Sequence, residues 1–357
     1  MHVVSRFVPV VVLAVLLIGI PAANADSEWQ TVTAPTTPIL YSVFMVSSTE
    51  GWAVGDGGII LHYSGGSWSP YTSPTTNRLS SVFMVSSSEG WAVGFDLTII
   101  HYTGGVWSLS VHDTIWSFYG VHMLSSTEGW AVGAPGIAYH YTGGSWVSVG
   151  TAPFGLTCSS VFMVSANDGW IVGQDGTILH YDGTSWSTYA TIPPGDMLRS
   201  VHMVSATEGW AIGDNGMIVH YSAPTWSAVT SPTTEDLNSL FMVSSSEGWA
   251  VGLNGVILHY SGGSWSLYTS SPTTDNLYSV YMLSLTDGWA GGGRWGDPDR
   301  GSIFQYSERQ TQRTPSNPYH YVGGEVFSAN KLAVLSPYLA LLSVIAVAAV
   351  VVKRRKT

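Results

Sequence analysis

The sequence is poor in charge and nearly free of cysteine. Only 10% of its 357 residues are charged, and Cys158 is the single cysteine, so no disulfide can form within the chain. No lysine lies between Asp26 and Asn330, where six arginines and 23 acidic residues give a formal charge of −17. A surface of this sign repels nucleic acid, which we therefore exclude as a partner. The sequence also lacks an Asn-x-Ser/Thr signal for N-glycosylation.

Long apolar runs occur only near the two ends. The first follows Arg6 and leads to Ala23-Asn24-Ala25, which predicts a signal peptide over residues 1–25. An uncleaved N-terminal anchor is the alternative. The second begins at Leu332, ends at Val352 and precedes a basic cluster, which predicts a transmembrane helix and cytoplasmic tail within residues 331–357. We expect a single-pass protein of the cell membrane, with the chain between these segments outside the cytoplasm.

One motif recurs seven times between the apolar segments. Its Gly-Trp pair places tryptophan at positions 52, 91, 130, 170, 210, 249 and 289, a spacing of 39 or 40 residues. This period is typical of four-stranded β-propeller blades. In the first copy we predict strands over residues 42–46, 52–55, 59–63 and 68–71, with Gly65-Gly66 as a tight hairpin turn. The sequence therefore predicts an all-β, seven-bladed β-propeller over residues 26–306.

A second set of tryptophans predicts how the ring closes. These residues begin outer strands: Trp29, Trp68, Trp107, Trp146, Trp186, Trp226 and Trp265. Trp29 precedes the first full blade, whereas no such tryptophan follows Tyr306 in the last one. We therefore expect the N-terminal strand to complete blade seven, which removes an exposed sheet edge. Residues 307–330 are polar and rich in Pro and Gly, and we expect a spacer there.

The repeat G-W-A-V-G, G-x-I-x-H-Y, G-G-S-W resembles the repeats of photosystem II stability and assembly factors. It is similar, more distantly, to the Asp-box (BNR) repeats of sialidases. The resemblance extends from Trp29 to Tyr306 and implies the propeller fold. The functions it implies are assembly of a membrane complex or hydrolysis of a glycan. The Asp-box acid is missing from most copies, and only Asp182 offers one.

Residues that recur in nearly every blade are interpreted as structural. They include one methionine per blade (45, 84, 123, 163, 203, 242, 282), one histidine in six blades (62, 101, 140, 180, 220, 259, with Gln305 in the seventh) and one acid before each Gly-Trp pair (50, 89, 128, 168, 208, 247, 287). Histidines spread around a ring cannot converge on one metal ion. We expect the acids to accept backbone N–H groups in the first hairpin of each blade. His122 and His202 replace a phenylalanine, and we expect them to be packed and satisfied internally.

Departures from the repeat gather in loops that share one face of a propeller. The longest is Arg294-Trp295-Gly296-Asp297-Pro298-Asp299-Arg300, and others include Phe95-Asp96, His112-Asp113, Trp116, Phe154, Arg199 and Glu235-Asp236. Aromatic residues beside acids and arginine suit recognition of a protein or carbohydrate. The candidate ligand-binding residues are Trp116, Arg199, Arg294, Trp295, Asp297, Asp299 and Arg300. Ordinary loop variation is the alternative, and calcium binding by Asp297 and Asp299 is left open.

These features favour a membrane-anchored binding module for a protein or glycan. An assembly factor ranks second, on the resemblance, and a sialidase-like hydrolase ranks third. The hydrolase would need an arginine cluster at the ring centre, yet only Arg199 stands beside the start of a predicted inner strand. We predict no catalytic residue, no metal and no cofactor.

Overall fold

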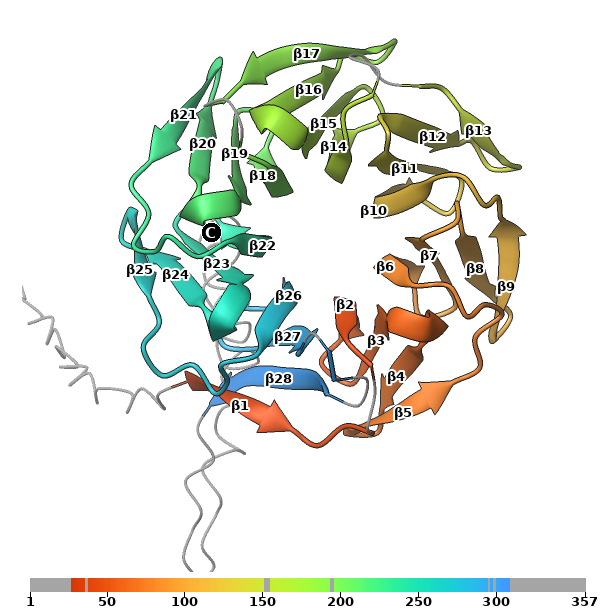
Figure 1. Cartoon of the computed structure of the whole chain (residues 1–357), viewed down its shortest axis with the longest axis horizontal. Coiled ribbons are helices and arrows are strands. Elements are labelled where there is room, and N and C mark those ends of the chain that lie inside the picture. The colour runs from red at the N-terminus through yellow and green to blue at the C-terminus, as the bar shows by residue number, and fades with distance from the viewer. Residues whose placement is uncertain are drawn as a thin grey trace, which may run out of the picture. The chain divides into compact units, whose positions relative to one another are not determined.

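The described part of the chain comprises residues 27–35, 38–150, 155–192, 196–294, 296–297 and 300–308 of a computed structural model. These residues form seven four-stranded sheets around a central axis (Figure 1), so the predicted propeller is confirmed. The predicted signal peptide, the membrane segment and all but the start of the spacer lie outside the described ranges. Within those ranges, no helix is long and apolar enough to cross a bilayer.

Every blade runs outward from the axis through four antiparallel strands. The inner strands are β2 (Leu40–Ser47), β6 (Leu79–Ser86), β10 (Ser117–Ser125), β14 (Cys158–Ser165), β18 (Leu198–Ser205), β22 (Leu237–Ser244) and β26 (Asn276–Met282). The second strands are β3 (Glu50–Gly55), β7 (Glu89–Gly94), β11 (Glu128–Ala134), β15 (Asp168–Gly173), β19 (Glu208–Gly213), β23 (Glu247–Gly252) and β27 (Gly288–Gly293). The third strands are β4 (Ile60–Ser64), β8 (Ile99–Thr103), β12 (Ile137–Tyr141), β16 (Thr177–Tyr181), β20 (Ile218–Ser222), β24 (Ile257–Ser261) and β28 (Gly301–Glu308). The outer strands are β5 (Ser67–Tyr71), β9 (Val106–Val111), β13 (Trp146–Ser148), β17 (Trp186–Thr191), β21 (Thr225–Val229), β25 (Ser264–Leu267) and β1 (Ser27–Val32).

The N-terminal strand closes the ring, as predicted. β1 pairs with β28 in the sheet ordered β1-β28-β27-β26, and Trp29 lies opposite Tyr306. The indole of Trp29 is buried and meets Trp249 of the preceding blade edge to face, at 5.7 Å between ring centroids. Blade seven is therefore built from both ends of the repeat region, and its outer edge is covered in the same way as those of the other blades.

The Gly-Trp pair is explained by packing against the repeated methionine. A Cβ atom on Gly51 would lie 2.2 Å from Sδ of Met45, so only glycine leaves room for this buried side chain. The equivalent contact recurs in the other blades, which confirms the methionines as core residues. The hairpin at Gly65 and Gly66 has φ values of 61° and 85°, as the predicted turn requires.

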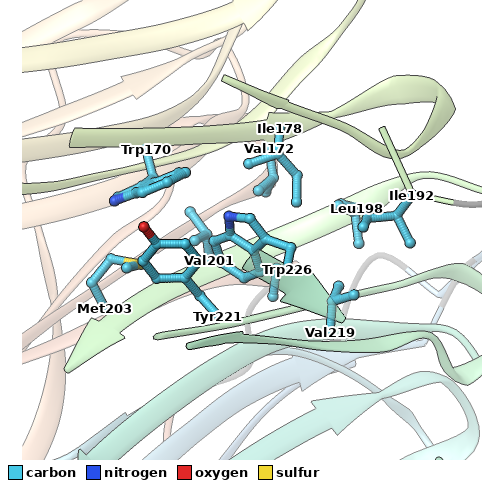
Figure 2. Close-up of a cluster of buried hydrophobic side chains, with 11 residues drawn as sticks. Trp170, Val172, Ile178, Ile192, Leu198, Val201, Met203, Val219, Tyr221 and Trp226 are labelled. Carbon is cyan, nitrogen blue, oxygen red and sulfur yellow. The ribbon is translucent and has the colours of Figure 1, made fainter. Parts of the chain in front are cut away.

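Tryptophans join neighbouring blades. Figure 2 shows the boundary between blades four and five, where Trp170 meets Tyr221 at 4.7 Å and Trp226 at 5.5 Å between centroids. Trp52 makes equivalent contacts at the boundary between blades one and two. Aromatic pairs of this kind contribute about 0.5–1.5 kcal/mol each beyond the burial of their area. Repeated around the ring, they hold the blades together without a disulfide.

Serines form a second link between inner strands. The backbone N–H of Val82 in blade two donates to Oγ of Ser42 in blade one at 3.2 Å, and five further boundaries have the same bond at 3.0–3.3 Å. Blade three has Gly120 at the serine position, so the bond to Val161 of blade four is missing. Six of the seven boundaries are therefore bridged in this way.

The repeated histidine lies beside the repeated acid and is hydrogen-bonded to it in blades four and six. His62 stacks on Trp52 with centroids 4.2 Å apart, and its Nε2 lies 3.8 Å from Oε1 of Glu50. In blade seven, Nε2 of Gln305 donates to Oδ1 of Asp287 at 3.4 Å. We expected the acid to accept the backbone N–H groups of the first hairpin, and this prediction is wrong. In blade one Oγ of Ser47 accepts the N–H of Thr49 in that turn, and the side chain of Glu50 lies near His62 on the third strand.

Candidate functional site: the mouth of the central channel

The residues that face the axis at the start of the inner strands are not uniform: three are tyrosine, two serine, one arginine and one asparagine. Each follows a buried apolar residue such as Leu40 or Leu79, and the seven are Tyr41, Ser80, Tyr119, Ser159, Arg199, Asn238 and Tyr278. Together with Arg78, Phe95, Thr157 and Met197 they line a cavity of about 440 Å³, here called the mouth cavity. All seven blades therefore contribute a side chain to one site. Its volume is within the range of known ligand pockets, about 300–1,000 Å³.

One side of the mouth cavity is an aromatic wall around Arg78. The guanidinium of Arg78 lies over the rings of Tyr41 and Phe95, 4.5 and 4.6 Å from their centroids. Tyr278 packs on Tyr41 at 5.0 Å, and Tyr119 meets Phe95 at 6.1 Å. Cation–π contacts hold the arginine against two rings, so aromatic side chains of blades seven, one, two and three meet on this side of the cavity.

An aspartate behind the wall fixes this arrangement. Nε of Arg78 donates to Oδ1 of Asp56 at 2.6 Å, and the hydroxyl of Tyr41 donates to Oδ2 at 3.3 Å. Burial raises the pKa of Tyr41, so its hydroxyl stays protonated and remains a donor. Asp56 belongs to η1 (Asp56–Gly58), the short turn between β3 and β4, and it links blade one to blade two.

The opposite side is polar and centred on Arg199. Its Nε donates to Asp214, and its Nη2 lies 3.4 Å from Oδ2 of Asp236. The other oxygen of Asp236, Oδ1, accepts the N–H of Asn215 at 2.9 Å. Asn238 donates to the carbonyl of Leu277 at 2.8 Å. The lining thus presents two guanidinium groups with their aspartates behind them. Beside them the lining carries tyrosine and serine hydroxyls, so these side chains can donate hydrogen bonds to a ligand.

A closed circle of seven aromatic rings lies deeper in the channel. Each of these rings belongs to the residue three positions after the mouth residue on the same inner strand, which places the circle about 10 Å further along the strands. Neighbouring centroids are 4.6–4.9 Å apart in the order Phe44, Phe83, His122, Phe162, His202, Phe241, Tyr281 and back to Phe44. The mouth cavity therefore opens above an aromatic floor.

Two members of this floor are histidines whose polar atoms are unsatisfied. The Nδ1 atoms of His122 and His202 are buried and have no hydrogen-bond partner. The packing that we expected is present, but the expected internal satisfaction is wrong. Burial lowers the pKa of His122 to about 4, and burial together with the charge of His122 lowers that of His202 to about 3. Both imidazoles are neutral at pH 7.

The structure separates the candidate residues into two groups. Arg199 lines the mouth cavity, whereas Trp116 lies in the loop before β10, outside the lining, with 43% of its surface exposed. Arg294 lies away from the lining and pairs with Asp275 at 3.7 Å, and Arg300 pairs with Asp297 at 3.4 Å. Trp295 and Asp299 fall outside the described residues, as does Phe154.

Sequence reasoning missed most of the mouth cavity. Tyr41, Arg78, Tyr119, Asn238 and Tyr278 were not among the candidates. A signal for four of them exists, because the position after the first buried residue of each inner strand changes in nearly every copy while its neighbours repeat. Over the described ranges, no group of three or more His, Cys, Asp or Glu side chains could hold a metal ion.

Asp182, the one acid at an Asp-box position, closes a hairpin. Its Oδ1 accepts the backbone N–H groups of Thr184 and Ser185, both at 2.9 Å. Hydrogen bonds from the Thr184 hydroxyl and these amides lower the pKa of Asp182 to about 2. This residue therefore stabilises the turn between β16 and β17.

Comparisons with known proteins show the fold. No protein-family model matches the chain, and no curated protein sequence matches it significantly. A structure of YCF48 bound to D1 peptide has a TM-score of 0.64 at 19% identity and covers 78% of this chain and 96% of that one. YCF48 from Cyanidioschyzon merolae gives 0.62 at 17%, over 78% and 98%. The WD40 propeller domain of Doa1 gives 0.64 at 16%, over 80% and 98%. At these identities the likeness supports the propeller and nothing finer, and the Asp-box resemblance stays a prediction.

Proposed function

We propose that this chain is a membrane-anchored, extracytoplasmic propeller that binds an extended segment of a partner protein in the mouth cavity. The observation that carries the proposal is the contrast between repeated and unrepeated residues. Core, turn and inter-blade residues recur because the fold needs them in every blade. Equivalent places around the mouth carry tyrosine, serine, arginine or asparagine in different blades, and these side chains converge on a single cavity.

A peptide suits the chemistry of this cavity. The aromatic wall around Arg78 offers a surface for an apolar side chain of the peptide. On the polar side, the Arg199 guanidinium and the Ser159 hydroxyl can donate hydrogen bonds to the peptide's backbone carbonyls. The structure of YCF48 bound to D1 peptide supports a peptide as ligand, since it has a similar fold. A sugar could also stack on the aromatic wall, and carbohydrate binding is the alternative. We propose no catalytic step.

The anchor gives the binding site a place in the cell. A signal peptide at residues 1–25 and a membrane helix from Leu332 to Val352 would hold the propeller outside the cytoplasm, close to other membrane proteins. Binding there is compatible with a role in assembling a membrane complex, which the repeat resemblance suggests. Protease added to intact cells should release the propeller and spare the basic tail. A protected propeller would refute this topology.

Site-specific photocrosslinking tests the proposed function. A photoreactive amino acid replaces Asn238 in the mouth cavity of the full-length protein in its native membrane. The matched control carries the same group at Ser87, which is exposed in the hairpin between β6 and β7 on the opposite face. We expect crosslinks to a protein partner from the Asn238 position and none from Ser87. Equal labelling from both positions, or crosslinks to glycan alone, would refute protein binding at the mouth.

A further inference from the structure

The loops on the mouth face pass close to one another at a glycine. In blade one, Gly58 ends the loop between β3 and β4 with a φ of 71°, and a Cβ atom there would lie 2.1 Å from the carbonyl oxygen of Thr75. Blade five has the same contact between Gly216 and Thr233, also at 2.1 Å. The loop that leads to the next blade therefore lies directly on the glycine, where no side chain fits.

Blade two breaks this rule. Leu97 occupies the glycine position with a φ of 43°, and its side chain is almost fully buried, with 3% exposed. The N–H of Leu97 donates to the carbonyl of Trp116 at 2.7 Å, which ties the loop before β10 to this point. The backbone of the following loop fills this space in blade one, whereas in blade two that loop packs over the side chain of Leu97.

This loop exposes two large apolar residues. Ile115 is 66% exposed and Trp116 43% exposed, and every other tryptophan in the described part of the chain is buried. We call Ile115 and Trp116 the rim patch. Trp116 precedes Tyr119 by three residues, and its carbonyl accepts the N–H of Leu97 in the loop that carries Phe95, so the backbone of the rim patch adjoins two elements of the aromatic wall. Exposed aromatic side chains beside a cavity are typical anchors for protein partners.

Charge beside the rim patch indicates the sign of the partner. The N–H of Asp113 donates to the carbonyl of Asp96 at 3.1 Å, so the two acids are neighbours, and neither is in an ion pair with any described residue. The nearest titratable neighbour in the loop is the exposed His112. The repeat region as a whole is acidic and contains no lysine, so its field attracts cations over a longer range.

Resting on the proposed function, we infer that the partner segment combines an apolar side chain with lysine or arginine. The apolar side chain packs on the rim patch, the basic residues face Asp96 and Asp113, and the segment continues into the mouth cavity. The same negative field would repel an acidic segment, despite the two arginines of the lining. The rim patch therefore acts as the first contact and the cavity as the specific one.

Three fluorescent twelve-residue peptides test this inference on the full-length protein in detergent. They share a central Trp-Leu pair and differ in flanks of lysine, serine or glutamate. Fluorescence anisotropy should show the lysine peptide binding about tenfold tighter than the serine peptide at low salt, with the difference shrinking at high salt. Trp116→Ala and Ile115→Ser should each weaken it by about five- to tenfold. The control Leu285→Ala, which removes an equally exposed side chain on the opposite face, should change nothing.

The double variant Asp96→Asn/Asp113→Asn should abolish the lysine preference and leave the serine peptide unaffected. If the glutamate peptide binds tightest, or if Trp116→Ala matches the control, the inference is wrong while protein binding at the mouth stands. If no peptide binds although the Asn238 crosslinker captures a protein, the partner has other chemistry and only this inference falls. If neither experiment detects binding, the proposed function falls with it.

Discussion

Replacing His122 and His202 with phenylalanine should protect this propeller against acid. Both side chains belong to the aromatic floor, where burial lowers their pKa values to about 4 and about 3. In the unfolded chain they protonate near pH 6.5, so below that pH the unfolded state binds protons that the folded state does not. The free energy of unfolding must then fall as the pH decreases. From pH 8 to pH 5 the loss is about 2 kcal/mol per histidine, or about 4 kcal/mol for both.

The substitution matches what the fold uses elsewhere. Four of the seven floor positions are phenylalanines, with neighbouring centroids at spacings similar to those around the histidines. Tyr281, the remaining member, has a pKa raised by burial to about 12 and stays neutral throughout this range. At pH 8 the double variant should be at least as stable as the parent, because two buried nitrogen atoms without partners are removed.

Denaturant unfolding of the parent and the His122→Phe/His202→Phe variant at several pH values provides the assay. The parent should lose about 4 kcal/mol more than the variant between pH 8 and pH 5, with each single variant in between. His140→Gln is the control, because glutamine occupies this repeated position in blade seven and His140 is not a member of the floor. Equal losses in the parent and the double variant would refute the assignment of these histidines as buried and neutral.

Three further changes test the packing of the ring. Gly120→Ser should add the missing bond to the N–H of Val161 and raise the free energy of unfolding by about 1 kcal/mol. The Cβ atom of the new serine would lie 3.3 Å from Cα of Ser160, so the strands must shift slightly. A lower melting temperature would mean that they cannot. Cys158→Leu should fill a cavity of about 10 Å³ beside that residue and stabilise the protein by up to about 1 kcal/mol in chemical denaturation. A lower free energy of unfolding would show that the leucine overpacks the site. Deleting residues 28–33 should lower the melting temperature, since β28 loses its partner, and an unchanged melt would contradict closure by β1.

The architecture could be predicted because each blade solves the same packing problem. The spacing of Trp52 and its equivalents gave the blade count, and the position of Trp29 before the first full blade gave the closure. Both predictions rest on residues that are large, buried and repeated, so their spacing can be recognised in the sequence alone. The proximity of His62 to Glu50 was not predicted, because it depends on how neighbouring strands align across the sheet.

The mouth cavity was harder to predict because it is made of residues that do not repeat. Arg199 was found by its position at the start of an inner strand, whereas Arg78 precedes its strand and reaches the cavity only by lying between Tyr41 and Phe95. The exposure of Trp116 depends on the loop before β10, which is tied to a leucine two residues from Phe95, and no spacing in the sequence reveals such a contact. Variation alone also favoured the loop of blade seven, whose Arg294 lies away from the lining.

Two substitutions that the protein itself uses in other blades test most directly whether function lies in the unrepeated residues. Tyr278→Ser introduces at the mouth the residue found at Ser80 and Ser159, and His140→Gln introduces at a repeated position the residue found at Gln305. Each full-length variant would be used to capture partners from native membranes, with its melting temperature measured in parallel. We predict that Tyr278→Ser loses the captured protein while remaining folded, with at most the small drop in melting temperature expected from its contact with Tyr41. His140→Gln should also melt earlier but still capture the protein. Loss of capture with His140→Gln alone, in protein that remains folded, would contradict a binding site at the mouth.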